Sequence, residues 1–282
     1  MPRLAVVPRE LAFVPFCGSA AISSGRLTRS MLRGGTWRRL FPDVYIQAAA
    51  FRPDDHRMWC DAVALMLESR YALDGLSAAF LWGVDLLPRT GVTVVSVSVS
   101  RCTRVRRHTR LAVRRTTFSA GDATTFGGIA LTTPVRTAFD LGRRPDRTDA
   151  VVAVDALTHR RLVTREALTR YAAQRAGRPG VRRLRDLLPL VEPLTESPME
   201  TRLRLLLHDA GAPPPTAQHE VCDRQGRLIA RVDLAYPQRV LAQVAAAIRE
   251  RRRPLSARPT PARSSPPLHR RSGPARSGRR NG

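Results

Sequence analysis

The sequence predicts an α+β protein built from two or three small domains. Apolar residues recur at helical spacing in residues 54–69 and again through 133–192. Between these blocks, "VTVVSVSVS" (92–100) alternates with the period of two that is typical of a strand. The hydrophobic content of 43% suits a globular core, and no apolar run approaches the ~18 residues of a membrane span. A chain of 282 residues can bury several modest cores of this kind.

The first unit, residues 1–48, has the parts of a winged helix-turn-helix. Thr28 is a suitable N-cap for a short helix that ends at the Gly34–Gly35 pair. After it, residues 39–46 read as a β element bent at 42–43. We expect its arginines to contact DNA, with a solvated α+β unit as the alternative; they are Arg26, Arg29, Arg33, Arg38 and Arg39. No room remains for a recognition helix between Gly35 and Arg39, so phosphate contact is expected rather than base-specific reading.

The second unit, residues 49–192, is predicted to begin with two helices within 54–87. One face of the first helix carries apolar side chains at helical spacing: Met58, Trp59, Ala62, Leu65 and Met66. Residues 92–133 are predicted to be β. Helices then follow to residue 192, with Thr133, Thr148 and Thr164 as N-caps.

An arginine-rich stretch lies within the β region, at "RCTRVRRHTRLAVRR" (101–115). A strand or hairpin would display its arginines as a ridge, for which backbone phosphate is the expected partner; a solvated turn is the alternative. The seven arginines are Arg101, Arg104, Arg106, Arg107, Arg110, Arg114 and Arg115. Because no aromatic residues are interleaved with these arginines, we do not expect stacking on single-stranded bases.

The third unit, residues 193–238, combines a capped helix with a hairpin. Ser197 and Glu200 form a capping box at the start of the helix, and Gly211 ends it. Two strands follow around the turn "DRQG" (223–226).

Charge and cysteine usage indicate the class of partner. All 48 basic residues are arginine, and against 23 acids they give a net charge of +25. A GC-rich genome explains the preference for arginine over lysine, but not the excess of positive charge. That excess favours a phosphate-rich partner; nucleic acid is the main candidate, and acidic lipid or acidic protein is less favoured. The four cysteines form no C-x-x-C pair and the N-terminus makes a poor signal peptide, so we predict a cytoplasmic protein with reduced thiols and no zinc.

Three segments resemble a known type of actinobacterial protein: "LTRSMLRGGTWRRLFPDVYI" (27–46), "TTPVRTAFDL" (132–141), and "TESPMETRLRLLLHDAGAPPPTAQHEV" with "RVDLAYP" (195–237). These proteins pair an AbiEi-antitoxin-like half with a domain related to the very-short-patch-repair (Vsr) endonucleases. The resemblance covers about residues 8–238. It implies an AbiEi-antitoxin-like region at 49–192, a restriction-endonuclease-like core at 193–238, and a toxin as partner.

The resemblance also implies a metal site, of which this sequence holds only part. Glu200 matches the helix carboxylate and Asp233 the hairpin carboxylate that hold Mg²⁺ in such nucleases. The next strand in relatives reads V-E-x-D-G-x-x-H, whereas here "RVLAQVAAAIRERR" (239–252) has no such acid, no Asp-Gly and no His. We therefore expect that Glu200 and Asp233 are vestigial metal-site carboxylates and that this sequence binds no cofactor. If the site is functional, we expect it to bind Mg²⁺.

The remaining residues, 239–282, hold twelve arginines against one acid, and six prolines between Pro254 and Pro274. Such a composition cannot bury enough surface to fold, so we expect disorder. One explanation is a shifted reading frame after Val240, which truncates the nuclease-like core; another frame would then encode the missing acid, Asp-Gly and His. The alternative is a native basic tail that binds nucleic acid.

The sequence thus predicts a DNA-binding, antitoxin-like regulator with an inactive nuclease remnant. Two alternatives stay open at this point. One is a Mg²⁺-dependent DNA endonuclease that uses Glu200 and Asp233. The other is an antitoxin module whose arginines meet an acidic toxin.

Overall fold

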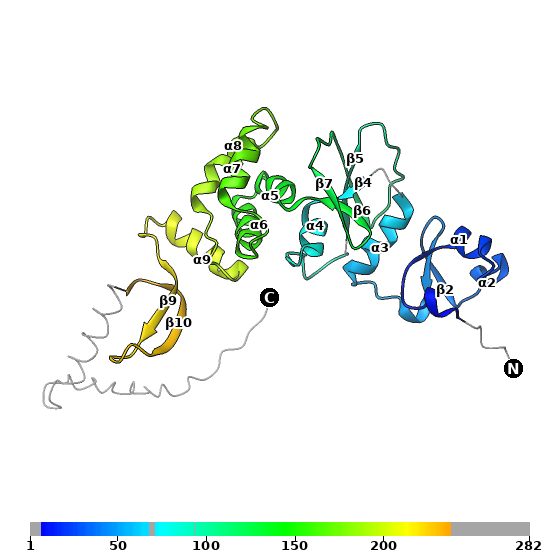
Figure 1. Ribbon diagram of the computed structural model, residues 1–282, viewed down its shortest axis with the longest axis horizontal. Helices are drawn as coiled ribbons and strands as arrows, with labels where there is room; N and C mark the ends of the chain where they lie inside the picture. Colours follow the sequence, from blue (N-terminus) through cyan, green and yellow to red (C-terminus); the bar gives the residue numbers. More distant parts are fainter. Residues whose placement is uncertain (1–6, 68–70, 93, 238–282) are drawn as a thin grey trace, which may run out of the picture. The chain divides into compact units, whose positions relative to one another are not determined.

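The computed structural model describes residues 7–67, 71–92 and 94–237, and it is a mixed α+β structure (Figure 1). Contacts join the residues up to Ala235 into one compact unit. Among the described residues, no helix has both the length and the apolar character needed to cross a membrane. The predictions made for residues 239–282, including the shifted frame, lie outside the described residues.

The N-terminal segment is a pair of short helices followed by a hairpin. Its strands form an antiparallel sheet in the order β1-β3-β2. Its elements are η1 (Arg9–Leu11), β1 (Phe16–Cys17), α1 (Gly18–Ser23), α2 (Arg29–Arg33), β2 (Trp37–Phe41) and β3 (Val44–Gln47). The predicted cap is confirmed, because the Thr28 hydroxyl accepts a hydrogen bond from the Met31 N–H at 3.2 Å. No helix lies between Gly35 and Arg39, as expected; the other short helix of this segment is α1, which precedes α2.

The central segment is a five-stranded sheet in the order β6-β5-β4-β8-β7. Its elements are η2 (Ala48–Ala50), α3 (His56–Leu67), β4 (Tyr71–Leu73), α4 (Gly75–Leu81), β5 (Val95–Ser100), β6 (Leu111–Thr116), β7 (Ala123–Phe126) and β8 (Ile129–Thr132). The predicted core face of α3 is buried at Met58, Trp59 and Ala62, whereas Leu65 is 40% exposed. The prediction of two helices in 54–87 missed β4, since three apolar residues carry no periodicity.

Strands β5 and β6 are parallel, which changes the interpretation of the arginine-rich stretch. Residues 101–110 form the connection that returns the chain to the start of β6, because parallel neighbours cannot be joined by a hairpin. Only Leu111–Thr116 is a strand. The predicted arginine ridge along a single strand or hairpin was therefore wrong.

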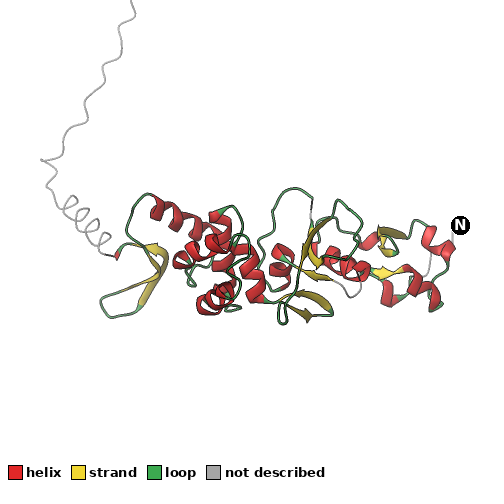
Figure 2. Cartoon of the chain, turned by 90° about the horizontal axis from the view of Figure 1, so that it is seen from above, coloured by secondary structure: helices red, strands yellow, loops and turns green. Residues whose placement is uncertain are grey.

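Helices make up the segment from 134 to 209 (Figure 2). They are α5 (Pro134–Gly142), α6 (Arg147–His159), α7 (Arg165–Ala173), α8 (Val181–Leu187), η3 (Leu188–Leu190) and α9 (Pro198–Asp209). Thr164 caps α7 as predicted, but Asp146, not Thr148, caps α6, through a 2.7 Å bond from the Asp149 N–H. An apolar core that includes Leu141, Leu157 and Leu205 holds these helices together.

The last described elements are β9 (Thr216–Cys222) and β10 (Leu228–Ala235), an antiparallel hairpin as predicted. Ser197 caps α9 by accepting from the Glu200 N–H at 3.3 Å. The other half of the capping box differs, because the Glu200 carboxylate accepts from the N–H of Glu196 rather than of Ser197.

Candidate nucleic-acid interface

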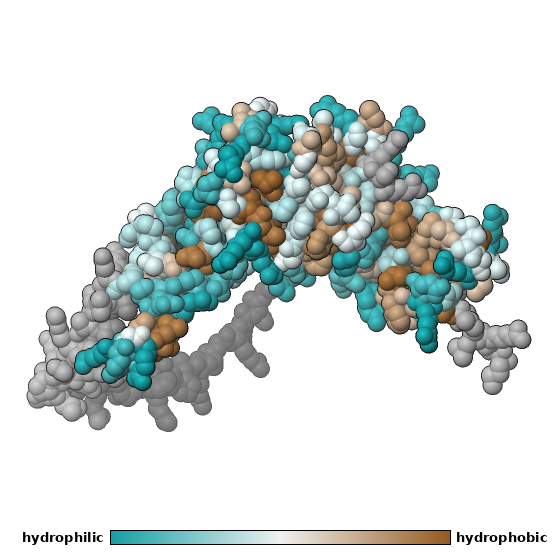
Figure 3. Space-filling view, in the orientation of Figure 1, coloured by the Kyte–Doolittle hydropathy of each residue, from teal (hydrophilic) through white to brown (hydrophobic). Residues whose placement is uncertain are grey.

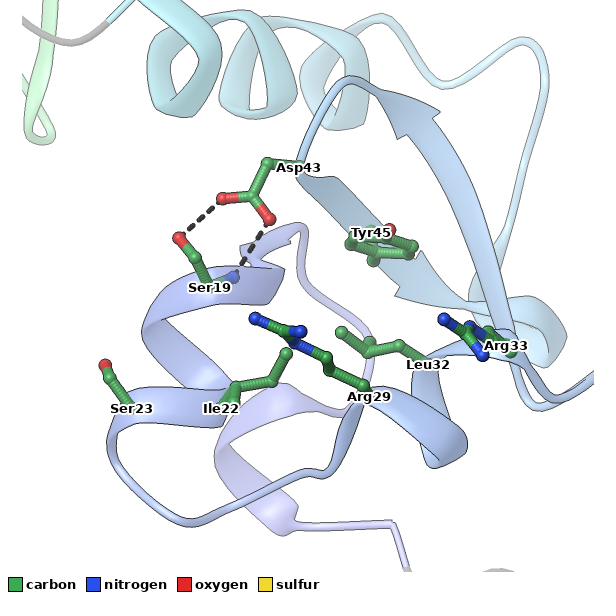
Figure 4. A pocket seen from close by; sticks show the side chains of 8 residues that line it. All are labelled: Ser19, Ile22, Ser23, Arg29, Leu32, Arg33, Asp43 and Tyr45. Carbon is green, nitrogen blue, oxygen red and sulfur yellow. Dashed lines mark hydrogen bonds between the residues drawn. The ribbon is translucent and has the colours of Figure 1, made fainter.

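An open hollow of about 440 Å³ lies between α1, α2 and the β2–β3 hairpin (Figure 4). Its lining residues are Ser19, Ile22, Ser23, Arg29, Leu32, Arg33, Asp43 and Tyr45. Asp43 fixes the start of α1 to the hairpin turn, because its carboxylate accepts from the Ser19 N–H (2.9 Å) and the Ser19 hydroxyl (2.6 Å). Burial acts to raise the pKa of Asp43, but hydrogen bonds from Cys17 and Ser19 outweigh it and lower the pKa below its usual value.

Gly18 permits this close approach of helix and hairpin. A Cβ at Gly18 would lie 2.6 Å from the Tyr45 ring and 3.0 Å from the Asp43 carboxylate. The geometry of the hollow therefore depends on a residue without a side chain.

The five N-terminal arginines divide into two groups. Arg29 and Arg33 lie exposed on α2, with no hydrogen bond or ion pair to any described residue, and the Arg29 side chain extends into the hollow (Figure 4). The guanidinium of Arg26 lies 3.3 Å from the Glu10 carboxylate. Arg38 stacks 3.8 Å from the centre of the Phe51 ring, and Arg39 donates to the Phe41 carbonyl at 3.2 Å.

The seven arginines of residues 101–115 also divide. Arg114 faces the helices, 3.7 Å from both the Asp74 and the Asp140 carboxylates. Arg110 lies over the Trp59 ring at 4.7 Å and donates to the Pro53 carbonyl. The others are exposed and form no ion pair within the described part of the chain: Arg101, Arg104, Arg106, Arg107 and Arg115.

The arginine-rich connection adjoins the N-terminal hairpin. The His108 ring packs against the Phe41 ring with 4.6 Å between centroids. A second open hollow includes His108 in its lining, together with Leu111, Val113, Arg107 and Arg115. The connection that carries the exposed arginines therefore contacts strand β2, which carries Arg38 and Arg39.

A buried ionic network joins sheet and helices, and it was not foreseen from the sequence. Arg136, only 5% exposed, donates to Asp140 at 2.7 Å and to Asp122 at 2.6 Å. Asp122 also accepts from the Tyr171 hydroxyl (2.6 Å) and the Arg175 guanidinium (2.8 Å). The i, i+4 spacing of Arg136 and Asp140 on a largely apolar helix was the available signal. This network gives Arg136 and Asp140 of "TTPVRTAFDL" a structural role.

The structure places the two predicted metal carboxylates on facing elements. Glu200 accepts from the Gln218 amide at 3.2 Å. Gln218 is opposite Asp233, because Val232 pairs with His219 and Leu234 with Ala217. Asp233 itself is exposed.

This pair does not fit a divalent metal. The same Glu200 oxygen already accepts from Gln218 and from the Glu196 N–H. Within residues 7–67, 71–92 and 94–237, no group of three or more His, Cys, Asp or Glu could hold a metal ion. Mg²⁺ and Ca²⁺ take about six or more oxygen ligands, of which two carboxylates supply too few.

Comparisons with known proteins agree with part of the predicted resemblance. Two curated relatives from Mycobacterium tuberculosis, the uncharacterized proteins Rv2248 and MT2308, are each 33% identical over 115 residues, 41% of this chain. The chain matches less than half of their length, 42%. The crystal structure of the RV2827C protein from Mycobacterium tuberculosis covers 81% of this chain, and 90% of its own chain is covered, with 17% identity and a TM-score of 0.45. Residues 72–190, from β4 to η3, match the model of the AbiEi antitoxin C-terminal domain family.

Proposed function

We propose that the protein is a DNA-binding regulator of the antitoxin type, whose residues 1–48 act as a winged helix. The observation that carries the proposal is the chain order of β1, α1, α2 and a hairpin, with the strands in the order β1-β3-β2. In this arrangement α2 takes the position of the helix that enters the major groove, and β2–β3 that of the wing. The further limits we propose are 49–192 for the antitoxin-like region and 193–238 for the nuclease-like remnant.

Charge supports the same proposal. Residues 7–47 hold six arginines and two acids, Glu10 and Asp43. Both acids are engaged, the first by Arg26 and the second by Ser19. The exposed arginines of α2 and of residues 101–107 are therefore available to phosphate oxygens, which gives affinity that falls steeply with salt.

The test is duplex-DNA binding by the full chain, measured by fluorescence anisotropy. Replacing Arg29 and Arg33 together by Ala removes the two guanidiniums of α2, which have no partner in the described part of the chain, and we expect at least a tenfold loss of affinity, ~1.4 kcal/mol. Arg26→Ala is the matched control, because that side chain is already held by Glu10. Equal affinities for all three proteins would refute the proposed role of α2.

Toxin binding is a second candidate function. It is favoured by the match of residues 72–190 to the antitoxin family model. We propose that this region binds a toxin protein. Co-purification of the full chain with the product of a neighbouring gene tests the idea, and protection of backbone amides within 72–190 from hydrogen exchange in the complex would support it. No complex, or protection confined to other residues, would contradict it.

For the Glu200 and Asp233 pair we propose a vestigial role without cleavage. Incubating supercoiled DNA with the protein and Mg²⁺ should give the same background nicking for the wild type and for Asp233→Ala. Mg²⁺-dependent nicking that Asp233→Ala abolishes would instead favour an endonuclease.

A further inference from the structure

The outer strand of the C-terminal hairpin is apolar and exposed, and no strand of the described residues pairs with one of its edges. Strand β10 pairs only with β9 among the described residues. Apolar side chains gather on this hairpin, where Figure 3 shows them at the surface. They are Val221 (38% exposed), Leu228 (58%), Ile229 (66%) and Val232 (41%). A long exposed edge strand of this composition is a template for pairing with another strand.

The two faces of the hairpin differ in character. Cross-strand pairs put Ala230 with Val221, and Leu234 with Ala217, on one face. The other face carries Arg231 and Asp233, since side chains alternate along a strand. Arg231 donates to Glu196 at 2.7 Å but stays 52% exposed, and a guanidinium has donors left for a second carboxylate.

The sequence of β10 is complementary to itself. Around Val232 it reads Ala230-Arg231-Val232-Asp233-Leu234, so an antiparallel copy centred on Val232 puts each arginine opposite an aspartate. The same register puts Ala230 opposite Leu234 of the second copy and Val232 opposite its own equivalent. Opposite charges and apolar pairs directly across antiparallel strands both stabilise the pairing.

We infer that the protein associates with a second copy of itself through β10, across a twofold axis at Val232. The two hairpins then form one four-stranded sheet in the order β9-β10-β10-β9. Such an interface is isologous, so every contact except that of Val232 with its own copy occurs twice, and the edge of β10 is covered. It also gives Asp233 a partner, Arg231 of the second copy. The inference does not depend on DNA binding.

Sedimentation velocity of the full chain over a range of concentrations tests it. We expect a dimer fraction that rises with concentration. Arg231→Asp or Asp233→Arg alone creates two like-charge pairs per interface and should weaken the dimer about tenfold. The double variant Arg231→Asp/Asp233→Arg restores opposite charges in the same register and should recover the dimer. Arg224→Asp in the hairpin turn is the control, because it makes the same charge change outside β10 and should leave the dimer intact.

A cysteine trap reports the register itself. In a chain with Cys102 and Cys222 replaced by serine, Val232→Cys should form an intermolecular disulfide under mild oxidation, because directly opposite residues have suitable Cα separations. Arg224→Cys, also exposed, should not. Circular dichroism melting checks that each variant is folded. A wild type that is monomeric at all concentrations, a double variant no better than the single ones, or equal crosslinking at 232 and 224 would each overturn the inference.

Discussion

Arg136 shows how a charged residue can be part of a core. Its guanidinium is buried between Asp122 and Asp140, and each of these carboxylates has a further arginine partner, Arg175 and Arg143 respectively. Removing one member of such a network leaves the others buried with less opposite charge to compensate them. The network therefore specifies how the sheet meets α5 and α7.

Replacing Arg136 by Met should lower the free energy of unfolding by about 3 kcal/mol, the low end of the usual cost, because Asp122 keeps Arg175 and Asp140 keeps Arg143 and Arg114. Urea denaturation measures the change. The control is Arg107→Met, an exposed arginine with no ion pair in the described chain, for which we expect a change within about 0.5 kcal/mol. An equal effect of the two substitutions would show that the buried network does not stabilise the fold.

The exposed arginines of the 101–110 connection should appear in the salt dependence of DNA binding. Replacing Arg104, Arg106 and Arg107 by Ala should reduce the slope of log K against log salt by about 2 to 3, since each phosphate contact contributes ~0.9. Arg114→Ala, next to Asp74 and Asp140, should leave the slope unchanged. If the triple variant keeps the wild-type slope, these arginines do not contact phosphate.

Among the elements, α9 and α6 are joined by a buried carboxylate, in addition to their shared apolar core. Asp155, 1% exposed, accepts from the Thr201 hydroxyl at 2.9 Å and from the Arg204 guanidinium at 2.7 Å. Burial raises the pKa of Asp155 from 3.8 to about 6 despite these partners. On α3, burial has the opposite consequence for His56, whose pKa falls from 6.5 to about 4.

Asp155 and His56 should change the free energy of unfolding with pH in opposite directions. Between about pH 4 and 6 the native state keeps the Asp155 proton that the unfolded chain releases, so the Asp155 contribution falls as pH rises, by up to about 3 kcal/mol. Between about pH 4 and 6.5 the native state lacks the His56 proton that the unfolded chain binds, so the His56 contribution rises with pH by a similar amount. In the wild type the two largely cancel.

Single variants should separate these contributions. We expect the unfolding free energy of Asp155→Asn to rise with pH from 4 to 6.5, and that of His56→Gln to fall from pH 4 to 6. Urea midpoints at several pH values measure both. Asp209→Asn is the control: its pKa is lowered by His208 and Arg147 on the surface, so it should not remove the fall attributed to Asp155. Parallel profiles for the two variants would contradict the assignment.

Elements with a local signal were predictable, and those set by distant pairing were not. The side-chain caps Thr28, Thr164 and Ser197 act within three residues, so the starts of α2, α7 and α9 follow from the sequence. The role of residues 101–110 depends on β6 lying parallel to β5, which no local pattern encodes.

The candidate interface follows the same rule. That its arginines are numerous is evident from the sequence. Which of them are free depends on partners far along the chain, as for Arg26 with Glu10 and Arg110 with Pro53. Likewise, the sequence identifies Glu200 and Asp233, but only the strand register puts Gln218 between them.

At the scale of the whole molecule, one hydrophobic core contains residues from both sides of the domain boundary that we propose at residue 48. Leu40, Phe41, Val44 and Ile46 of the N-terminal hairpin are buried in the same cluster as Trp59 of α3 and the central strands. The N-terminal segment therefore shares its stability with the central sheet.

Phe41→Ala should test this shared core. Phe41 is 2% exposed and packs on Trp59 and His108, so the cavity should cost about 3 to 5 kcal/mol. We expect tryptophan fluorescence and far-ultraviolet circular dichroism to show one coincident, earlier transition. Phe13→Ala, at a 76% exposed site, should change the midpoint little. Two separate transitions in the wild type would mean that the segments unfold independently.

The contact between Phe41 and His108 has a thermodynamic consequence. Phe41 belongs to the hairpin we assign to DNA, and His108 to the region that matches the antitoxin family. Consider a protein that binds over the second hollow, which is lined by His108, and shifts the Phe41 and His108 rings. Such a protein would change the affinity for DNA by some factor. Linkage then requires that DNA change the affinity for that protein by the same factor, so occupancy of one side reports the state of the other.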